Sequence, residues 1–590
     1  MTYTPPLNDI LFVLTRLVGL DKLAALPGHD SVSEDLTRSI LEEAGKLAAE
    51  TFAPLNHKGD KQGLKFSNNI VTMPDGFVAA YKEYVDGGWN GLSSSEAIGG
   101  QGLPATLAMP VQEMLQTANI SLALCTLLNQ GAIELLHTHG SELQKKTYLP
   151  KMVSGAWSGT MNLTEPQAGS DVGAVRCKAV KDGNHYKIYG QKIYISYGEH
   201  NMAENIIHLV LARLPDAPEG TKGLSLFLVP KFLVNADGSL GARNDALAIS
   251  IEHKLGQHAS PTCTMAYGDK NGAYAELVGI ENRGIEAMFV MMNNARIGVG
   301  LQGLALCERA MQHAAHFARG RVQSKPLKTN ALKGADKPVA IIEHPDVRRM
   351  LMLMKSQTEA ARALAYSAAF AIDCKQQERV DLLTPIVKAW ITDLSNELTS
   401  TAVQIFGGMG YIEETGAAQH MRDARVLAIY EGTNGIQAND LVFRKLTKDD
   451  GKAFGIYLSE MREVAKRIGG EHGDDAMQIA LNLNLSLDHL EQAAKHLISL
   501  AKRDMNAAAF AAAPFLRLFA ITAGGAKLAE SAAIANQELK NPRDFSADFL
   551  ISKIITARFY AESVLPQTAG LLPTILANQN GVMTMPEDWF

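Results

Sequence analysis

The chain has 590 residues, of which 46% are hydrophobic and 20% are charged, a balance typical of a soluble globular protein. This length exceeds what a single hydrophobic core organises, so we expect several domains. The net charge of −6 argues against strong non-specific binding to nucleic acid, which depends on an excess of Lys and Arg.

The five cysteines are scattered along the chain and contain no CxxC pair. This pattern predicts neither a disulfide framework nor a zinc site, and we expect no bound metal. No cationic stretch precedes an apolar one near the N-terminus, so no secretory signal is expected and the predicted location is cytoplasmic. The apolar stretch 507–526 contains Pro514 and Arg517 and is interpreted as a packed helix, not a membrane span.

The first two regions are predicted to be helical. Residues 1–32 form an N-terminal extension with an apolar stripe at helical spacing. Residues 33–155 form a helical domain, with one helix from Ser33 to Phe52, ended by Pro54, and a helical block from Thr106 to Leu149.

The residue composition changes near Ser154, and residues 156–280 are predicted to form a β domain. Its segments are short and rich in Val, Ile, Tyr and Thr, and Asp182-Gly183-Asn184 has the composition of a hairpin turn.

The remaining chain is predicted to be helical again. Residues 281–448 form a four-helix bundle, with helices from Gly284 to Arg319, His344 to Cys374 and Thr384 to Phe406. Residues 449–590 form an extra helical domain after a linker at 449–451, with helices near 476–503, 507–537 and 546–565. The predicted fold class is therefore mostly α with a central β domain.

Three segments have the composition of sites where the backbone approaches a planar ring or a phosphate. They are the small-residue loop 162–171, the strand 190–198 with Tyr194 and Ser196 on one face, and the glycine-rich run 404–411 at a helix end. Each segment taken alone is equally compatible with an ordinary turn, strand or helix cap.

Glu431 lies in the run Ala428-Ile429-Tyr430-Glu431-Gly432-Thr433-Asn434-Gly435. A carboxylate on a tight turn with apolar neighbours is suited to remove a proton from carbon. An isolated loop glutamate is usually only solvated, so its interpretation depends on the three segments above.

In this order, the segments resemble the acyl-CoA dehydrogenase family of flavoproteins over about residues 35–447. The resemblance implies an acyl-CoA dehydrogenase fold with a central β-barrel, FAD as cofactor and Glu431 as the general base. The helix on which some members carry the base instead reads Phe289-Val290-Met291-Met292-Asn293 here and offers no carboxylate.

The resemblance also assigns the remaining site residues. Tyr194 and Ser196 stand where the family has Trp and Thr, Asn293 stands where it has Asp, and Ser324-Lys325 replaces the usual Phe-Gly after the Arg-x-Gln element. The implied FAD contacts are Leu163, Thr164, Gly169, Tyr194, Ile195, Ser196, Arg321, Gln323, Gln404, Phe406, Gly407, Gly408, Thr433 and Gln437. The implied substrate contacts are Ser170, Asn293, Arg296, Tyr430 and Gly432.

The implied reaction is α,β-dehydrogenation of an acyl-CoA thioester to a trans-2-enoyl-CoA. Glu431 takes the α-proton, a hydride passes to the flavin, and the electrons leave to an electron-transfer flavoprotein. Hydrogen bonds to the thioester oxygen must stabilise the enolate-like charge that develops there. The family pattern implies a homodimer or a dimer of dimers, because parts of the cofactor site come from a neighbouring subunit.

The length and the extra C-terminal domain are similar to those of bacterial 3-methylmercaptopropionyl-CoA dehydrogenases of dimethylsulfoniopropionate breakdown. The expected substrate is therefore 3-(methylthio)propanoyl-CoA, with medium- and long-chain fatty acyl-CoA of β-oxidation as the alternative. A DNA-binding alkylation-response flavoprotein and a non-catalytic scaffold are more distant alternatives. The basic residues after residue 490 are dispersed among acidic ones and form no stripe, so neither nucleic acid nor membrane is an expected partner.

Overall fold

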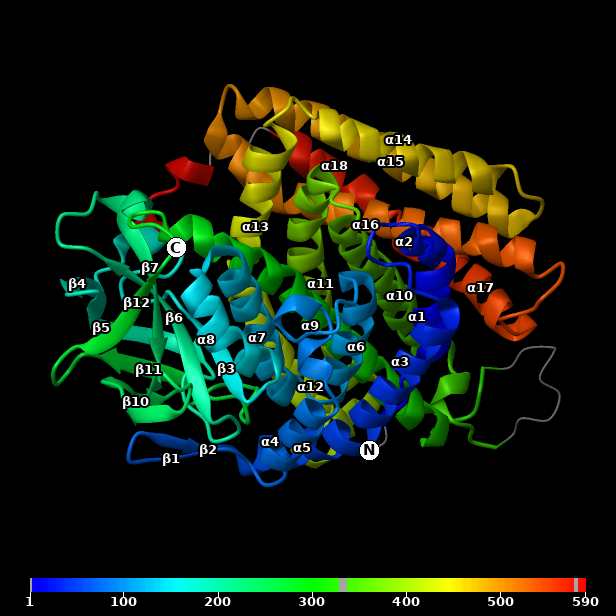
Figure 1. Cartoon of the computed structure of the whole chain (residues 1–590). Helices are drawn as coiled ribbons and strands as arrows, with labels where there is room; N and C mark the ends of the chain where they lie inside the picture. The colour runs from blue at the N-terminus through cyan, green and yellow to red at the C-terminus, as the bar shows by residue number, and fades with distance from the viewer. Residues whose placement is uncertain (1–2, 328–336, 578–581) are drawn as a thin grey trace. The chain divides into compact units, whose positions relative to one another are not determined.

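The computed structural model describes residues 3–327, 337–577 and 582–590 (Figure 1). The chain divides into two units. Unit 1 comprises Met1–Pro5 and Glu43–Gly298, and unit 2 comprises Pro6–Glu42 and Val299–Phe590. The division falls inside two helices, α3 (Glu34–Lys46) and α9 (Gly284–Gly320). Residues 6–32 of the N-terminal extension therefore group with the C-terminal half of the chain.

Unit 1 combines helices with a β domain. Its helical segments are η2 (Leu47–Phe52), α4 (Ala53–Gln62), α5 (Phe77–Asp86), η3 (Trp89–Gly91), η4 (Glu96–Ile98), α6 (Ala105–Ala118), α7 (Ile120–His139), α8 (Glu142–Val153), η5 (Val172–Ala174) and η6 (Gly220–Gly223). Its strands are β1 (Lys65–Ser67), β2 (Ile70–Thr72), β3 (Trp157–Asn162), β4 (Lys178–Asp182), β5 (His185–Ser196), β6 (Asn205–Arg213), β7 (Leu224–Pro230), β8 (Phe232–Val234), β9 (Leu240–Arg243), β10 (Ala246–Ile251), β11 (Thr262–Tyr267) and β12 (Ala273–Val278).

The main sheet has eight strands and closes on itself. The strand order is β10-β11-β5-β12-β7-β6-β3, and β4 pairs with both β5 and β6. The pairings therefore run around a closed circuit of β4, β5, β12, β7 and β6, which removes exposed edges from that part of the sheet. The β4–β5 hairpin turns through Gly183, whose φ of +64° suits a two-residue turn, as the sequence predicted.

The regular secondary structure described in unit 2 is helical, and an isolated β-bridge joins Val322 to Ala340. Its segments are α1 (Leu7–Phe12), η1 (Val13–Val18), α2 (Leu20–Ala24), η7 (Ile341–Glu343), α10 (Pro345–Asp373), α11 (Gln377–Phe406), η8 (Gly407–Tyr411), η9 (Glu413–Thr415), α12 (Ala417–Ala424), η10 (Arg425–Ala428), α13 (Asn434–Asp440), η11 (Leu441–Leu446), α14 (Lys452–Gly469), α15 (Asp474–Ala501), α16 (Met505–Glu538), α17 (Ala547–Ser563), α18 (Gln567–Leu576), η12 (Val582–Thr584) and η13 (Glu587–Trp589). The long α16 packs against α10, α14, α15 and α17, so it is the central helix of the C-terminal part.

Some helix ends differ from those predicted from the sequence. Pro54 does not end the helix that begins in α3, because the π-helical turn η2 precedes it and Pro54 sits in the first turn of α4, where its missing N–H is tolerated. Helix α11 begins seven residues before Thr384 and accommodates Pro385 in its interior. Helices α14 and α18 were not predicted, and Asp449 caps the start of α14 by accepting the backbone N–H groups of Gly451, Lys452 and Ala453.

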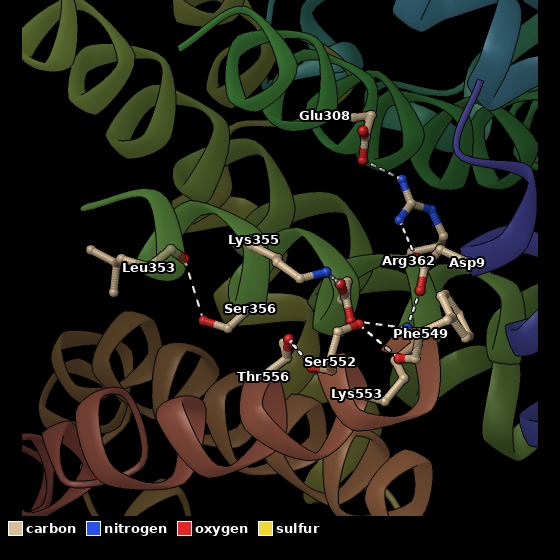
Figure 2. Close-up of polar contacts among 11 residues, drawn as sticks. Asp9, Glu308, Leu353, Lys355, Ser356, Arg362, Phe549, Ser552, Lys553 and Thr556 are labelled. Atoms are coloured by element: carbon tan, nitrogen blue, oxygen red, sulfur yellow. Dashed lines mark hydrogen bonds and ion pairs between the residues drawn. The ribbon is translucent and has the colours of Figure 1, made fainter. Parts of the chain in front are cut away.

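A buried charge cluster joins α1, α9, α10 and α17 within unit 2 (Figure 2). Arg362 pairs with Asp9 and with Glu308 at 2.7 Å, and Lys553 pairs with Asp9 and with Glu359 at 2.9 Å. Lys355 also pairs with Glu359. Three acids therefore face three bases, the compensation that buried ions require.

Two helices, α7 and α16, are long and apolar enough by length and composition to cross a membrane. Within the described residues, 83% of the apolar window of α7 and 72% of that of α16 is buried inside the protein. Such burial is typical of core helices.

Candidate functional site

In unit 1, Lys192 ties the loop after β3 to strand β5. Its side chain is completely buried, and Nζ donates to the Leu163 carbonyl at 2.8 Å and pairs with Glu165 Oε1 at 2.8 Å. The backbone N–H of Ile193 donates to the Thr164 carbonyl at 2.9 Å. The structure thus brings the predicted residues Leu163 and Thr164 beside the strand segment that carries Tyr194, Ile195 and Ser196.

Glu165 fixes the shape of this loop. Its carboxylate accepts the backbone N–H groups of Arg176 at 2.7 Å and Cys177 at 3.0 Å. Burial by itself raises the pKa of Glu165, but the Lys192 ammonium and these N–H donors outweigh burial and lower it. The loop then turns at Ala168 and leaves Gly169 and Ser170 exposed.

Tyr194 lies in a β-bulge at the end of β5. The pairing of β5 with β11 shifts register between Cys263 and Met265, and Tyr194 has a φ of +60°. A tyrosine in this region is uncommon, and bulges often re-aim a side chain next to an active site. The Tyr194 side chain is 60% exposed, Ile195 is buried and Ser196 is half-buried. Because the bulge and the positive φ interrupt the alternation of the strand at Tyr194, the shared face of Tyr194 and Ser196 stays a prediction.

The part of α9 in unit 1 carries two of the predicted substrate contacts. Asn293 is exposed, and Arg296 is half-buried with Nη1 donating to Asn293 Oδ1 at 3.4 Å. The Nε donor of Arg296 is buried and has no hydrogen-bond partner within the described residues. An unpaired buried donor is costly, so this N–H is available to a bound polar group.

In unit 2, Glu431 occupies a strained turn between η10 and α13. Its φ is +55° and that of Gly432 is +83°. A non-glycine residue held in this region costs on the order of 1–3 kcal/mol and persists only where the surroundings enforce it. Such strain concentrates at functional sites and supports a functional role for Glu431.

Gln437 and Thr433 support this turn from α13. Gln437 is completely buried, and its Nε2 donates to the Glu431 carbonyl at 3.4 Å. Its Oε1 is buried and has no hydrogen-bond partner in the described part of the chain. Thr433 caps α13 by accepting the Ile436 backbone N–H at 3.4 Å.

Tyr430 precedes Glu431 and is half-buried. Its hydroxyl donates to Oε1 of Gln302, a wholly buried residue of α9. Burial of the hydroxyl and the nearby charge of Glu431 raise the pKa of Tyr430 well above its usual range, so it is a neutral donor.

The glycine-rich end of α11 is open to solvent. Phe406 is buried and stacks on Phe317 at 4.1 Å between ring centroids. The next residue, Gly407, has a φ of +60°, and a Cβ on Gly407 or Gly408 would meet no atom within 4 Å. Gln404 is exposed beside them, so the backbone here is accessible to a ligand.

Arg321 and Gln323 follow the end of α9 and are both exposed. The Gln323 N–H donates to the Val339 carbonyl at 2.9 Å, and the Arg321 carbonyl accepts the Ile341 N–H at 2.7 Å. These backbone hydrogen bonds join residues 321–323 to residues 339–341.

The sequence interpretation missed the buried polar residues behind these turns, namely Lys192, Glu165, Gln302 and Lys388. Lys388 lies in the apolar run of α11, and its Nζ donates to the Gly432 carbonyl at 2.7 Å. A charged residue inside an apolar helix run needs a buried partner, and that signal was available for Lys388. Gln302 had no comparable signal. Among the residues with described positions, no group of three or more His, Cys, Asp or Glu side chains is arranged to hold a metal ion.

Four family models match the chain in succession. They are the acyl-CoA dehydrogenase N-terminal domain at residues 34–156, its middle domain at 160–269, its C-terminal domain at 282–446, and an acetyl-CoA dehydrogenase C-terminal-like domain at 457–586.

Full-length relatives match as well. The chain is 44% identical to a 3-methylmercaptopropionyl-CoA dehydrogenase of Ruegeria pomeroyi, over 96% of each chain. It is 35% identical to a butyryl-CoA dehydrogenase of Syntrophomonas wolfei, over 100% of this chain and 99% of that one. Its fold is similar to the crystal structure of an acyl-CoA dehydrogenase complexed with FAD from Bacillus anthracis, with a TM-score of 0.73, 18% identity, and coverage of 95% and 92% of the two chains.

Proposed function

Because the chain belongs to the acyl-CoA dehydrogenase family, we propose that Glu431 is the base that takes the α-proton from an acyl-CoA thioester. The protein is an oxidoreductase of this family, and FAD is the cofactor of the family. The observation that carries the assignment is the strained turn at Glu431, which buried side chains hold in place.

The residues of each unit fit the cofactor. In unit 1, the exposed Tyr194 ring is a flat wall for a flavin, and the Ser196 hydroxyl is a donor two residues away. In unit 2, the open backbone at Gly407 and Gly408 suits close contact with a cofactor, and buried Gln437 Oε1 lacks a hydrogen-bond partner within the described residues.

The mechanism assigns separate tasks to the residues of the catalytic turn. The α-proton of a thioester is weakly acidic, so its removal needs a positioned carboxylate and donors aimed at the thioester oxygen. The Glu431 carboxylate takes the proton, and its backbone N–H is the donor that we assign to the oxygen. When bound, FAD supplies the acceptor for the two electrons and the β-hydrogen. The hydrogen bond from the Tyr430 hydroxyl to Gln302 fixes the residue that precedes Glu431.

The proposed substrate is 3-(methylthio)propanoyl-CoA. Its support is the Ruegeria pomeroyi relative, whose similarity extends through the extra C-terminal domain. The alternative is a medium- or long-chain fatty acyl-CoA of β-oxidation. The butyryl-CoA dehydrogenase of Syntrophomonas wolfei supports a fatty acyl-CoA in general, and its own substrate is a short one. The proposed electron acceptor is an electron-transfer flavoprotein, and the proposed assembly is a homodimer or a dimer of dimers.

The charges of the C-terminal helices support an enzyme over a DNA-binding protein. Basic side chains on α15, α16 and α17 pair with acids of the same unit, as in Lys495–Glu491, Arg517–Glu397 and Lys527–Glu530. Side chains paired in this way form no continuous basic surface for phosphates.

Anaerobic reduction of the purified flavoprotein by a panel of acyl-CoA thioesters tests the proposal. The panel contains 3-(methylthio)propanoyl-, butyryl-, octanoyl- and palmitoyl-CoA, and the measurement is the loss of flavin absorbance. Fastest reduction by the first at low concentration supports the sulfur substrate, whereas preference for another thioester supports a fatty acyl-CoA dehydrogenase. Absence of reduction by every thioester would overturn the proposed function.

A further inference from the structure

The carbonyl that follows the catalytic base is held by a buried ammonium group. Lys388 has no exposed surface, and its Nζ lies 2.7 Å from the Gly432 carbonyl oxygen and 2.8 Å from Asn434 Oδ1. From these contacts, and resting on the proposed role of Glu431, we propose that Lys388 is a positioning residue for the catalytic base.

The backbone of Glu431 needs support from its surroundings. Glu431 and Gly432 have φ values of +55° and +83°; glycine adopts such a value freely, whereas Glu431 does so only under constraint. Gln437 Nε2 holds the Glu431 carbonyl, and Lys388 holds the Gly432 carbonyl. Together they fix the two peptide planes that follow Glu431, and these planes set the direction of its side chain.

Asn434 extends this constraint to α11. Its Nδ2 donates to the Ala389 carbonyl at 3.0 Å, to Thr392 Oγ1 at 3.0 Å and to Asp393 Oδ1 at 2.6 Å. The first residue of α13 is therefore bound to a full turn of α11, and Lys388 lies within the same group of contacts. The charged donor makes the bond to Gly432 stronger than one from a neutral group.

The test compares Lys388→Met with Lys388→Arg and with Lys553→Met as purified holoenzymes. Methionine preserves the length and apolar character of the side chain but removes the donor. We expect Lys388→Met to retain its flavin and KM and to lose about ten- to a hundred-fold in kcat, the scale for a small misplacement of a catalytic group. Arginine restores a charged donor, so Lys388→Arg is expected to recover several-fold of that loss.

Lys553→Met is the matched control, because Lys553 is also a buried lysine of unit 2 but pairs with Asp9 and Glu359. It is expected to lower thermal stability and leave kcat of the folded enzyme unchanged. Where Lys388→Met fails to fold, Asn434→Ala replaces it, and we expect a smaller loss of about three-fold in kcat alone, because the lysine remains in place.

The outcomes separate this inference from the proposed function. Normal kcat in Lys388→Met, or an equal loss in Lys553→Met, would overturn the positioning role while the wild-type activity stands. A rise in KM with unchanged kcat would also overturn it. Failure of the wild-type protein to reduce its flavin with any thioester would remove the proposed function and this inference together.

Discussion

Asp9 and Lys553 form a buried ion pair although 544 residues separate them in the chain. Both side chains belong to unit 2, and Figure 2 shows them beside Arg362. Lys553 also lies over the rings of Phe12 and Phe549, at 5.2 and 5.4 Å from their centroids. The N-terminal extension and the extra C-terminal helices therefore share one core.

Removal of one ion from this cluster should destabilise both ends of the chain. Asp9→Asn leaves Lys553 and Arg362 with too little compensating charge, and the expected loss is about 3–5 kcal/mol. Amide hydrogen exchange should accelerate in α1 and α17. Asp488→Asn, at a pair whose carboxylate is 64% exposed, is the control and should change stability by less than about 1 kcal/mol. Unchanged exchange in α17 of Asp9→Asn would contradict the coupling.

The same cluster predicts an acid-sensitive contribution to stability. Burial by itself raises the pKa of Asp9, but Lys553, Arg362 and Lys355 outweigh burial and lower it well below its usual range. The folded pKa is thus below the unfolded value of about 3.9, so the contribution is complete above that pH and is lost as the pH falls below it. Because both pKa values of Asp9 lie below about pH 4, the difference in thermal midpoint between wild type and Asp9→Asn should be constant from about pH 7 to 5. It should shrink below about pH 4. A difference that grows on acidification would contradict the assignment.

Glu431→Gln should abolish proton abstraction without disturbing the fold. The amide occupies nearly the same volume but accepts no proton, so turnover should fall by at least about ten-thousand-fold, the upper range for loss of a general base. The bound flavin absorbance should remain. Measurement of steady-state turnover and of single-turnover flavin reduction checks this, and near-normal rates would remove Glu431 from the mechanism.

Gly432→Ala should damage the catalytic turn selectively. The position has a φ of +83°, and a Cβ would lie 2.9 Å from Gln437 Nε2, which holds the Glu431 carbonyl. We expect a loss of about a hundred-fold in kcat with retained flavin. Gly435→Ala is the matched control three residues later, because its φ is not in the left-handed region and its nearest neighbour is Thr433 Oγ1 at 4.0 Å. Equal effects of both substitutions would contradict a specific role for the turn.

Tyr194 should contribute to flavin retention and not to stability. Glycine adopts its φ of +60° without strain, so Tyr194→Gly should unfold at a temperature no lower than wild type in the cofactor-free state. Loss of ring stacking should weaken flavin binding roughly two- to twelve-fold, the equivalent of about 0.5–1.5 kcal/mol. Tyr194→Phe keeps the ring and should bind flavin normally. Titration of cofactor-free wild type and both variants with FAD measures the affinity. Equal affinity of all three proteins would contradict stacking of the Tyr194 ring on the flavin.

Local sequence patterns predicted much of the fold because many helices and turns have a clear apolar period or characteristic turn residues. The apolar period of α11 and the hairpin turn at Gly183 are both determined by residues close together in the chain. The end of α3 was misjudged because Pro54 is compatible with a helix once a π-helical turn precedes it, and this turn has no clear sequence signal.

Some features of the candidate site could likewise be predicted from local sequence, and others required the structure. Glu431 and Tyr194 were proposed as site residues from their sequence segments and the family resemblance, whereas their positive φ values were not predicted. Lys388 could have been noticed as a charge within an apolar helix. Its partner, the Gly432 carbonyl, lies 44 residues further along and required the structure.

The pairing of α1 with α17 also constrains the order in which the protein can be completed during synthesis. Asp9 leaves the ribosome long before Lys553 is translated, and at about 5–20 residues per second the interval is roughly half a minute to two minutes. During this time the apolar side of α1, including Phe12, lacks its final neighbours Phe545 and Phe549. The nascent chain therefore has an apolar N-terminal segment without its final packing partners until the last helices emerge. A chaperone that binds short apolar segments would bind α1 during this time.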